Sequence, residues 1–318
     1  MQLTAMTASP TDPTAGDLSS AEAFSILADE TRVRILRALG ASGQRNPKQM
    51  PYKPFDTDDP EGLTYSELRE RADVRDSGRF NYHLRELVGH YIEKSGETYR
   101  LSWLGILAFR FIIAGVLHDQ VTVEPFETDS PCGNCGARLE ASYPNEQLFF
   151  LECPECGTRP VGTDLPTHAI RNRSHTELLD VLDRRERGQI SLMSDGICFW
   201  CAGRVEAALH PVPASDDRGI SRSQPVVTLL CQDCGGLRFP TVGEVVATDS
   251  RVGAFVTDHA PSLRDRYIWE WPFATSQELV TVTSTDPLRV EVEIEGDDGR
   301  NAVVAVDEQG SITSVERD

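Results

Sequence analysis

Long apolar runs are missing from this sequence, and so is a leader-like beginning. The best candidate for a membrane span, residues 103–117, contains Arg110 and is too short to cross a bilayer. The first 17 residues are rich in Thr, Ser, Pro and Ala and lack the basic and apolar regions of a signal peptide. We therefore expect no membrane association and no export, which places the protein in the cytoplasm.

Lysine is also scarce, and acidic residues are in excess. Three of the 31 basic residues are lysines, and 50 acidic residues give a net charge of −19. Nucleic-acid-binding proteins are usually basic, so this charge argues against DNA binding. Residues 1–120, however, carry 17 acidic and 14 basic side chains, so most of the negative charge follows them. The acidic, lysine-poor composition resembles proteins of salt-loving archaea, where molar salt screens charges within about 3 Å.

Cysteine is absent from the first 131 residues, and every later cysteine belongs to a Cys-x-x-Cys pair. Each pair forms a tight turn that brings two thiolates to one ion, and two turns complete a tetrahedral shell. Gly136 and Gly157 suit the left-handed backbone that follows such a turn. We predict two zinc ribbons, each with one structural zinc ion in a closed shell of four cysteines. The predicted ligands are Cys132, Cys135, Cys153 and Cys156 in the first ribbon, and Cys198, Cys201, Cys231 and Cys234 in the second.

Three other uses of paired cysteines compete with zinc. Redox dithiols occur singly at a strand–helix turn rather than as four pairs. Disulfides need an oxidising compartment, which the missing export signal argues against. Iron–sulfur clusters also use four cysteines and stay open as an alternative.

Residues 63–101 have the pattern of two helices joined by a tight turn and followed by a two-stranded hairpin. Thr64 and Glu67 have capping-box spacing. Phe80, Leu84 and Leu87 fall on one side of the second helix, which predicts a buried stripe and an open opposite side. This order is typical of a winged helix-turn-helix, whose second helix enters the major groove. The candidate DNA contacts are Ser77, Arg79, Asn81, Tyr82, His83, Arg85, Lys94 and Arg100.

Two segments resemble ArsR-type winged-helix regulators. Residues 24–39 (FSILADETRVRILRAL) resemble the first helices of that family, and residues 82–87 (YHLREL) with Gly89 resemble its recognition helix. The resemblance covers about residues 20–118 and implies a regulator that binds double-stranded DNA. Members of that family commonly sense metals with Cys or His on these helices, and the missing cysteines exclude a thiolate sensing site here. The insert 41–62 departs from the family pattern, and we predict a loop.

Residues 103–118 form an apolar helix with almost no polar side, which predicts burial. In winged-helix regulators the corresponding helix often pairs two subunits, so we predict a homodimer through this helix. The alternative is that the helix packs on the chain's own domains.

The remaining segments complete an α+β multidomain architecture. We predict a linker over 119–130, a helix over 171–187, a helix over 251–260, an aromatic core at 267–273 and an antiparallel β-meander at the C-terminus with an acidic face. The C-terminal part resembles the zinc-ribbon domains of uncharacterised haloarchaeal regulators, which identifies no ligand. The predicted domains are a disordered lead-in (1–18), a winged helix-turn-helix (19–120), the first ribbon (127–165), a linking helix (166–192), the second ribbon (193–261) and a small β-domain (262–318).

These patterns favour a sequence-specific DNA-binding transcriptional regulator with structural zinc. The alternative is a zinc-ribbon adaptor that binds proteins of the transcription machinery and does not read DNA sequence. No nucleophile–base set, phosphate-binding loop or open metal site is visible in the sequence, so we do not expect an enzyme. No small-molecule ligand is identifiable either.

Overall fold

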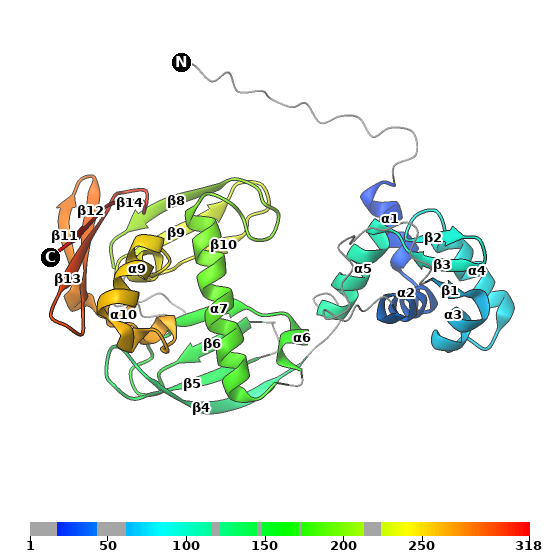
Figure 1. Cartoon of the computed structure of the whole chain (residues 1–318), viewed down its shortest axis with the longest axis horizontal. Coiled ribbons are helices and arrows are strands. Elements are labelled where there is room, and N and C mark those ends of the chain that lie inside the picture. The colour runs from blue at the N-terminus through cyan, green and yellow to red at the C-terminus, as the bar shows by residue number, and fades with distance from the viewer. Residues whose placement is uncertain (1–17, 43–61, 116–120, 145–147, 172, 213–223) are drawn as a thin grey trace, which may run out of the picture. The chain divides into compact units, whose positions relative to one another are not determined.

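The protein is α+β, with ten α-helices and four antiparallel sheets in the residues that the structure describes. The structure is a computed structural model, and it describes residues 18–42, 62–115, 121–144, 148–171, 173–212 and 224–318 (Figure 1). The chain divides into two compact units, residues 1–117 and 118–318. Residues 1–17 of the predicted lead-in and 43–61 of the predicted loop lie outside the described residues. In the described ranges, no helix is both long and apolar enough to cross a membrane.

In its described residues, the first unit contains five helices and one small sheet of order β1-β3-β2. Its elements are α1 (Ser20–Leu27), α2 (Glu30–Ser42), β1 (Leu63–Thr64), α3 (Tyr65–Arg71), α4 (Ser77–Leu87), β2 (Ile92–Ser95), β3 (Thr98–Leu101) and α5 (Trp103–Ala114). The predicted stripe of α4 is confirmed, because Phe80, Leu84 and Leu87 are buried. They share a core with Ile35 and Leu36 of α2.

Gly40 does not end the second helix, although glycine is a common helix terminator. Helix α2 continues to Ser42. A Cβ atom on Gly40 would lie 2.3 Å from the ring of Phe109, so this glycine allows close packing of α2 against α5.

Within the first unit, the apolar helix after the hairpin is covered on one side only. Only Gly105 and Ala108 of α5 are buried, whereas Trp103 is 56% and Phe111 54% exposed. The helix packs one side on α2 and leaves large apolar side chains on the other. It ends at Ala114, with Gly115 as a left-handed cap, and residues 116–118 of the predicted helix lie outside the described part.

The second unit contains three sheets, of order β4-β5-β6-β7, β10-β9-β8 and β11-β12-β13-β14. The strands are β4 (Val123–Pro131), β5 (Arg138–Tyr143), β6 (Leu148–Glu152), β7 (Val161–Asp164), β8 (Val205–His210), β9 (Val226–Cys231), β10 (Leu237–Arg238), β11 (Val280–Thr285), β12 (Leu288–Glu295), β13 (Asn301–Val306) and β14 (Ile312–Arg317). The prediction of a linker over 119–130 was wrong. Most of this segment is strand β4, which pairs with β5 through Phe126 and Glu127, among other residues. Strand β11 was not predicted and adds a fourth strand to the meander.

The helices of this unit are α6 (Thr167–Ile170), α7 (His175–Ser194), α8 (Val242–Ala247), α9 (Ser250–His259) and α10 (Pro272–Thr275), with short 3-10 turns η2 (Pro261–Leu263), η3 (Ile268–Glu270) and η4 (Gln277–Leu279). The helix predicted over 171–187 begins and ends later, because Ser174 caps it with Glu177 and Arg171 instead ends α6. Figure 1 shows the long helix α7 running through this unit.

One continuous apolar core holds the second unit together. It joins Leu178, Leu182 and Met193 of α7 to both ribbons and to the inner face of the meander. The predicted aromatic core is confirmed, since Trp269, Trp271 and Phe273 are buried. The segments predicted as two ribbons, a linking helix and a β-domain therefore all contribute to this single core.

Four helices begin with the same capping device. In α1, α3, α7 and α8 a Ser or Thr accepts a hydrogen bond from the backbone N–H of a Glu three residues on, whose carboxylate accepts from the capping residue. Each box satisfies two backbone N–H groups that a helix start leaves without partners.

The core of the first unit can be tested at Phe80. Replacing this fully buried ring in Phe80→Ala should lower the free energy of unfolding by about 3–5 kcal/mol, because a cavity is left in the core. Urea denaturation measures this change from the unfolding transition of the first unit. Tyr82→Ala on the same helix is the matched control, since Tyr82 is 56% exposed. Equal losses in both variants would contradict the observed orientation of α4.

Candidate metal centres and the exposed side of helix α4

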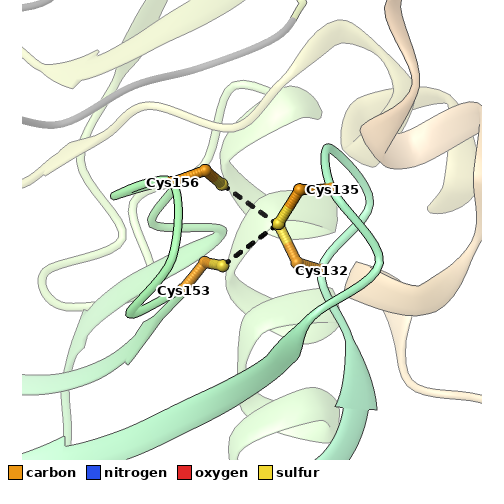
Figure 2. A group of neighbouring side chains, drawn as sticks. All are labelled: Cys132, Cys135, Cys153 and Cys156. Atoms are coloured by element: carbon orange, nitrogen blue, oxygen red, sulfur yellow. Dashed lines mark hydrogen bonds between the residues drawn. The ribbon is translucent and has the colours of Figure 1, made fainter.

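Two turns bring the first four cysteines together (Figure 2). Cys132 and Cys135 follow β4, and Cys153 and Cys156 follow β6. The Cys132 and Cys156 sulfurs are 3.6 Å apart, and those of Cys135 and Cys153 are 3.5 Å apart. Each turn is closed by a backbone hydrogen bond from the glycine after the second cysteine. Both glycines have positive φ, 76° at Gly136 and 70° at Gly157, as the sequence predicted.

The second group has the same arrangement on different elements. Cys198 and Cys201 lie in the turn between α7 and β8, whereas Cys231 ends β9 and Cys234 lies between β9 and β10. The sulfurs of Cys198 and Cys234 are 3.6 Å apart, as are those of Cys201 and Cys231. The predicted grouping of the eight cysteines into two sets of four is therefore confirmed.

Each group can hold one metal ion with four sulfur ligands. Within each group the sulfurs lie within 4.8 Å of one another. A tetrahedral ion with bonds of about 2.3 Å requires sulfurs about 3.8 Å apart, which these distances approach. An ion held by all four thiolates of a group would have no coordination position left for water.

The thiols of the first group differ in acidity. Burial raises the pKa of Cys156, but hydrogen bonds from Thr158 and Asn134 outweigh burial and lower it to about 6. The amide of Ala137 favours the thiolate of Cys135, yet the neighbouring thiols raise the pKa of Cys135 to about 12. At neutral pH this group therefore holds both a thiolate and protonated thiols, and metal binding must release protons.

A polar network links the surroundings of the two groups. The guanidinium of Arg238 on β10 contacts Asp164 on β7, and its Nε donates to the side-chain oxygen of Gln189 on α7 at 3.0 Å. It also lies 4.6 Å from the ring centroid of Phe199, inside the turn of Cys198 and Cys201. Sequence analysis missed this network, since no motif spacing connects residues so far apart in the chain.

The predicted DNA contacts on α4 fall into two sets. Ser77, Arg79, Tyr82 and Arg85 are exposed, and Asn81 is half-buried. On the hairpin, Lys94 is exposed, whereas Arg100 is half-buried and forms an ion pair with Glu93 at 2.8 Å.

His83 does not lie on the open side of α4, and that prediction was wrong. Its ring is buried, its Nδ1 accepts a hydrogen bond from Arg32 Nε at 3.3 Å, and the Asp29 carboxylate is 3.4 Å away. Arg32 also donates to the carbonyl of Ile26. His83 therefore joins α4 to the start of α2, and its polar ring atoms contact side chains inside the unit.

Substituting one cysteine ligand tests whether the two groups bind metal independently. We expect Cys153→Ser and Cys231→Ser each to lower the bound metal from two to one equivalent per chain, because each belongs to a different group. Elemental analysis of the purified protein measures the content. Ser130→Ala, in strand β4 just before Cys132, is the control and should keep both equivalents. Loss of both ions from either single variant would contradict two independent shells.

Two protein-family models match this chain. Residues 20–112, within the first unit, match a domain of unknown function (DUF7347), and residues 129–312, within the second, match a domain of unknown function (DUF7351). No curated protein and no solved structure is significantly similar to the chain. Because the second match covers more than half of the 318 residues, the chain belongs to the DUF7351 family.

Proposed function

We propose that this protein is a sequence-specific DNA-binding transcriptional regulator of ArsR-like type, and that its first unit is a winged helix-turn-helix. The observation that supports the proposal is that α4 has one buried side and one exposed side. One side, with Phe80, Leu84 and Leu87, is buried, and the other presents Arg79, Tyr82 and Arg85 to solvent. An exposed helix with guanidinium groups matches what major-groove recognition requires.

The hairpin β2–β3 supplies the wing in this proposal. Four residue pairs join the strands, from Ile92↔Leu101 to Ser95↔Thr98. Lys94 is exposed, with its ammonium 5.4 Å from the ring centroid of Tyr99. Because Arg100 is paired with Glu93, we assign the principal backbone contact of the wing to Lys94.

The distribution of charge is compatible with DNA binding by the first unit. Strand β12 exposes Glu291, Glu293 and Glu295 on one face of the meander, in the second unit. A row of glutamates repels phosphate. We therefore assign DNA binding to the first unit, in a cytoplasm whose salt screens the repulsion from the acidic sheet.

We propose that the two four-cysteine groups hold zinc and stabilise the second unit. Shells of four cysteines at this ligand spacing are the usual environment of structural zinc. An iron–sulfur cluster in either group would show as colour and visible absorption in the purified protein, whereas zinc is silent.

DNA recognition can be tested by selecting binding sequences from random duplexes with the purified, metal-loaded protein. We then expect Arg79→Ala and Arg85→Ala to weaken binding to a selected duplex about tenfold or more, since a base-edge contact contributes about 1–3 kcal/mol. Fluorescence polarization at fixed salt measures the affinity. Arg289→Ala, an exposed arginine of β12 in the second unit, should bind like the wild type.

The outcomes of this test separate the leading function from its alternative. Enrichment of a defined sequence, together with losses at Arg79 and Arg85, supports the regulator. Binding without sequence preference, or no binding, favours a zinc-ribbon adaptor that contacts proteins of the transcription machinery.

We further propose that the protein is a homodimer through α5. The helix leaves Trp103, Leu104 and Phe111 exposed, and exposed apolar patches of this kind mark interaction sites. Two winged helices related by a two-fold axis match the symmetry of a palindromic operator.

A charge placed on this helix should weaken self-association. We expect Phe111→Glu to lower the average mass of the protein at a fixed concentration, because the carboxylate must be desolvated in the interface. Sedimentation equilibrium measures the mass. Val282→Glu on β11 is the matched control, since Val282 is 50% exposed in the second unit. An unchanged mass in Phe111→Glu would contradict pairing through α5.

A further inference from the structure

Exposed apolar side chains gather at the second four-cysteine group. In the described part of residues 118–318, seven large hydrophobic side chains are exposed, and four of them are Ile197, Trp200, Leu230 and Phe239. All four belong to the ribbon formed by β8, β9, β10 and the turn of Cys198 and Cys201. Such clustering is unusual for a surface that stays in water.

The strand register places these residues on one face of the sheet. Ile197 forms a bridge with Arg204, Glu206 lies opposite Leu230, and Leu230 lies opposite Leu237. Cross-strand partners share a face, and so do residues two apart along a strand, which adds Phe239. We call this the ribbon face, made of Ile197, Arg204, Glu206, Leu230, Leu237 and Phe239. The opposite face, with Val205, Leu229 and Cys231, is buried in the core.

The second cysteine turn also carries an exposed aromatic side chain. Its two aromatic residues have different surroundings: Phe199 is covered by Arg238, whereas Trp200 is 48% exposed. A Cβ atom on Gly236 would lie 3.7 Å from the Trp200 ring. The indole therefore lies beside Gly236 at the start of β10, next to the sulfurs of Cys198 and Cys234.

The charges on the ribbon face are balanced. Arg204, just before β8, and Glu206 in β8 are two residues apart, both are exposed, and they carry opposite charges. The whole chain has a net charge of −19, so two copies repel each other over most of their surfaces. Arg204 and Glu206 cancel each other's charge, so this pair adds no net repulsion between two copies.

From this geometry we infer that the ribbon face binds a second copy of the chain. In a two-fold interface each contact is made twice. If the two β8 strands cross in opposite directions, Arg204 faces the partner's Glu206 and Glu206 faces the partner's Arg204. One copy thus offers the other an apolar surface and two complementary ion pairs. This association is distinct from the pairing proposed for α5.

Charge reversal tests the inference in the full-length, metal-loaded chain. The Phe111→Glu substitution is kept in every sample, so that α5 does not contribute. In this background, Arg204→Glu and Glu206→Arg should each weaken self-association about tenfold, because each variant places like charges opposite each other twice. The double variant Arg204→Glu/Glu206→Arg should associate like its parent. Sedimentation velocity over a concentration series at about 0.15 M salt measures the dissociation constants.

Mixing the two single variants gives the sharper result. A chain with two glutamates and a chain with two arginines are complementary, so an equimolar mixture should associate where neither variant does alone. Metal content and circular dichroism confirm that each variant is folded, and Arg289→Glu is a control for charge alone. No association in the parent, unchanged association in both single variants, or no gain on mixing would each overturn the proposed contact.

Discussion

In the second unit, the contacts of one guanidinium group, that of Arg238, join both ribbons to the central helix α7. Arg238 contacts Asp164 of the first ribbon's sheet and Gln189 of the central helix, and it stacks on Phe199 in the second cysteine turn. A cation removed from water needs such partners, so these three segments must meet around it. Glu186, one turn before Gln189 on α7, lies in the same region, and burial raises the pKa of its carboxyl. The two ribbons are therefore parts of one body, joined through α7.

The features that sequence analysis predicted correctly are those with a short-range signal. The Cys-x-x-Cys spacing fixes a local turn, and the eight cysteines form the two predicted groups. The spacing of Phe80, Leu84 and Leu87 identifies the buried side of α4, and the alternation of Val290, Val292 and Ile294 identifies the inner face of β12. Each pattern repeats with the period of its element, so a few neighbouring residues suffice to recognise it.

The features that were missed depend on residues distant in sequence. His83 looked like a surface residue of α4, but it contacts Arg32 of α2 and Asp29, the residue before α2. The segment before Cys132 looked like a linker in the sequence. Its strand β4 pairs irregularly with β5, with two register shifts, so it lacks a regular alternation of buried and exposed residues. Helix α5 looked buried because it is apolar throughout, whereas the first unit covers only one of its sides. Composition identifies an apolar surface without identifying what covers it.

The repeated capping boxes also make the stability of several helix starts depend on pH. Hydrogen bonds from Ser19, Thr64 and Ser174 hold the pKa values of Glu22, Glu67 and Glu177 below their ordinary value of 4.5. A depressed pKa in the folded state stabilises the protein fully above the unfolded value, and this contribution disappears as the pH falls through the folded value. Mild acid therefore leaves these helix starts intact. As the pH falls through their lowered pKa values, the three carboxylates become protonated, and the first turns of α1, α3 and α7 lose these hydrogen bonds in both units.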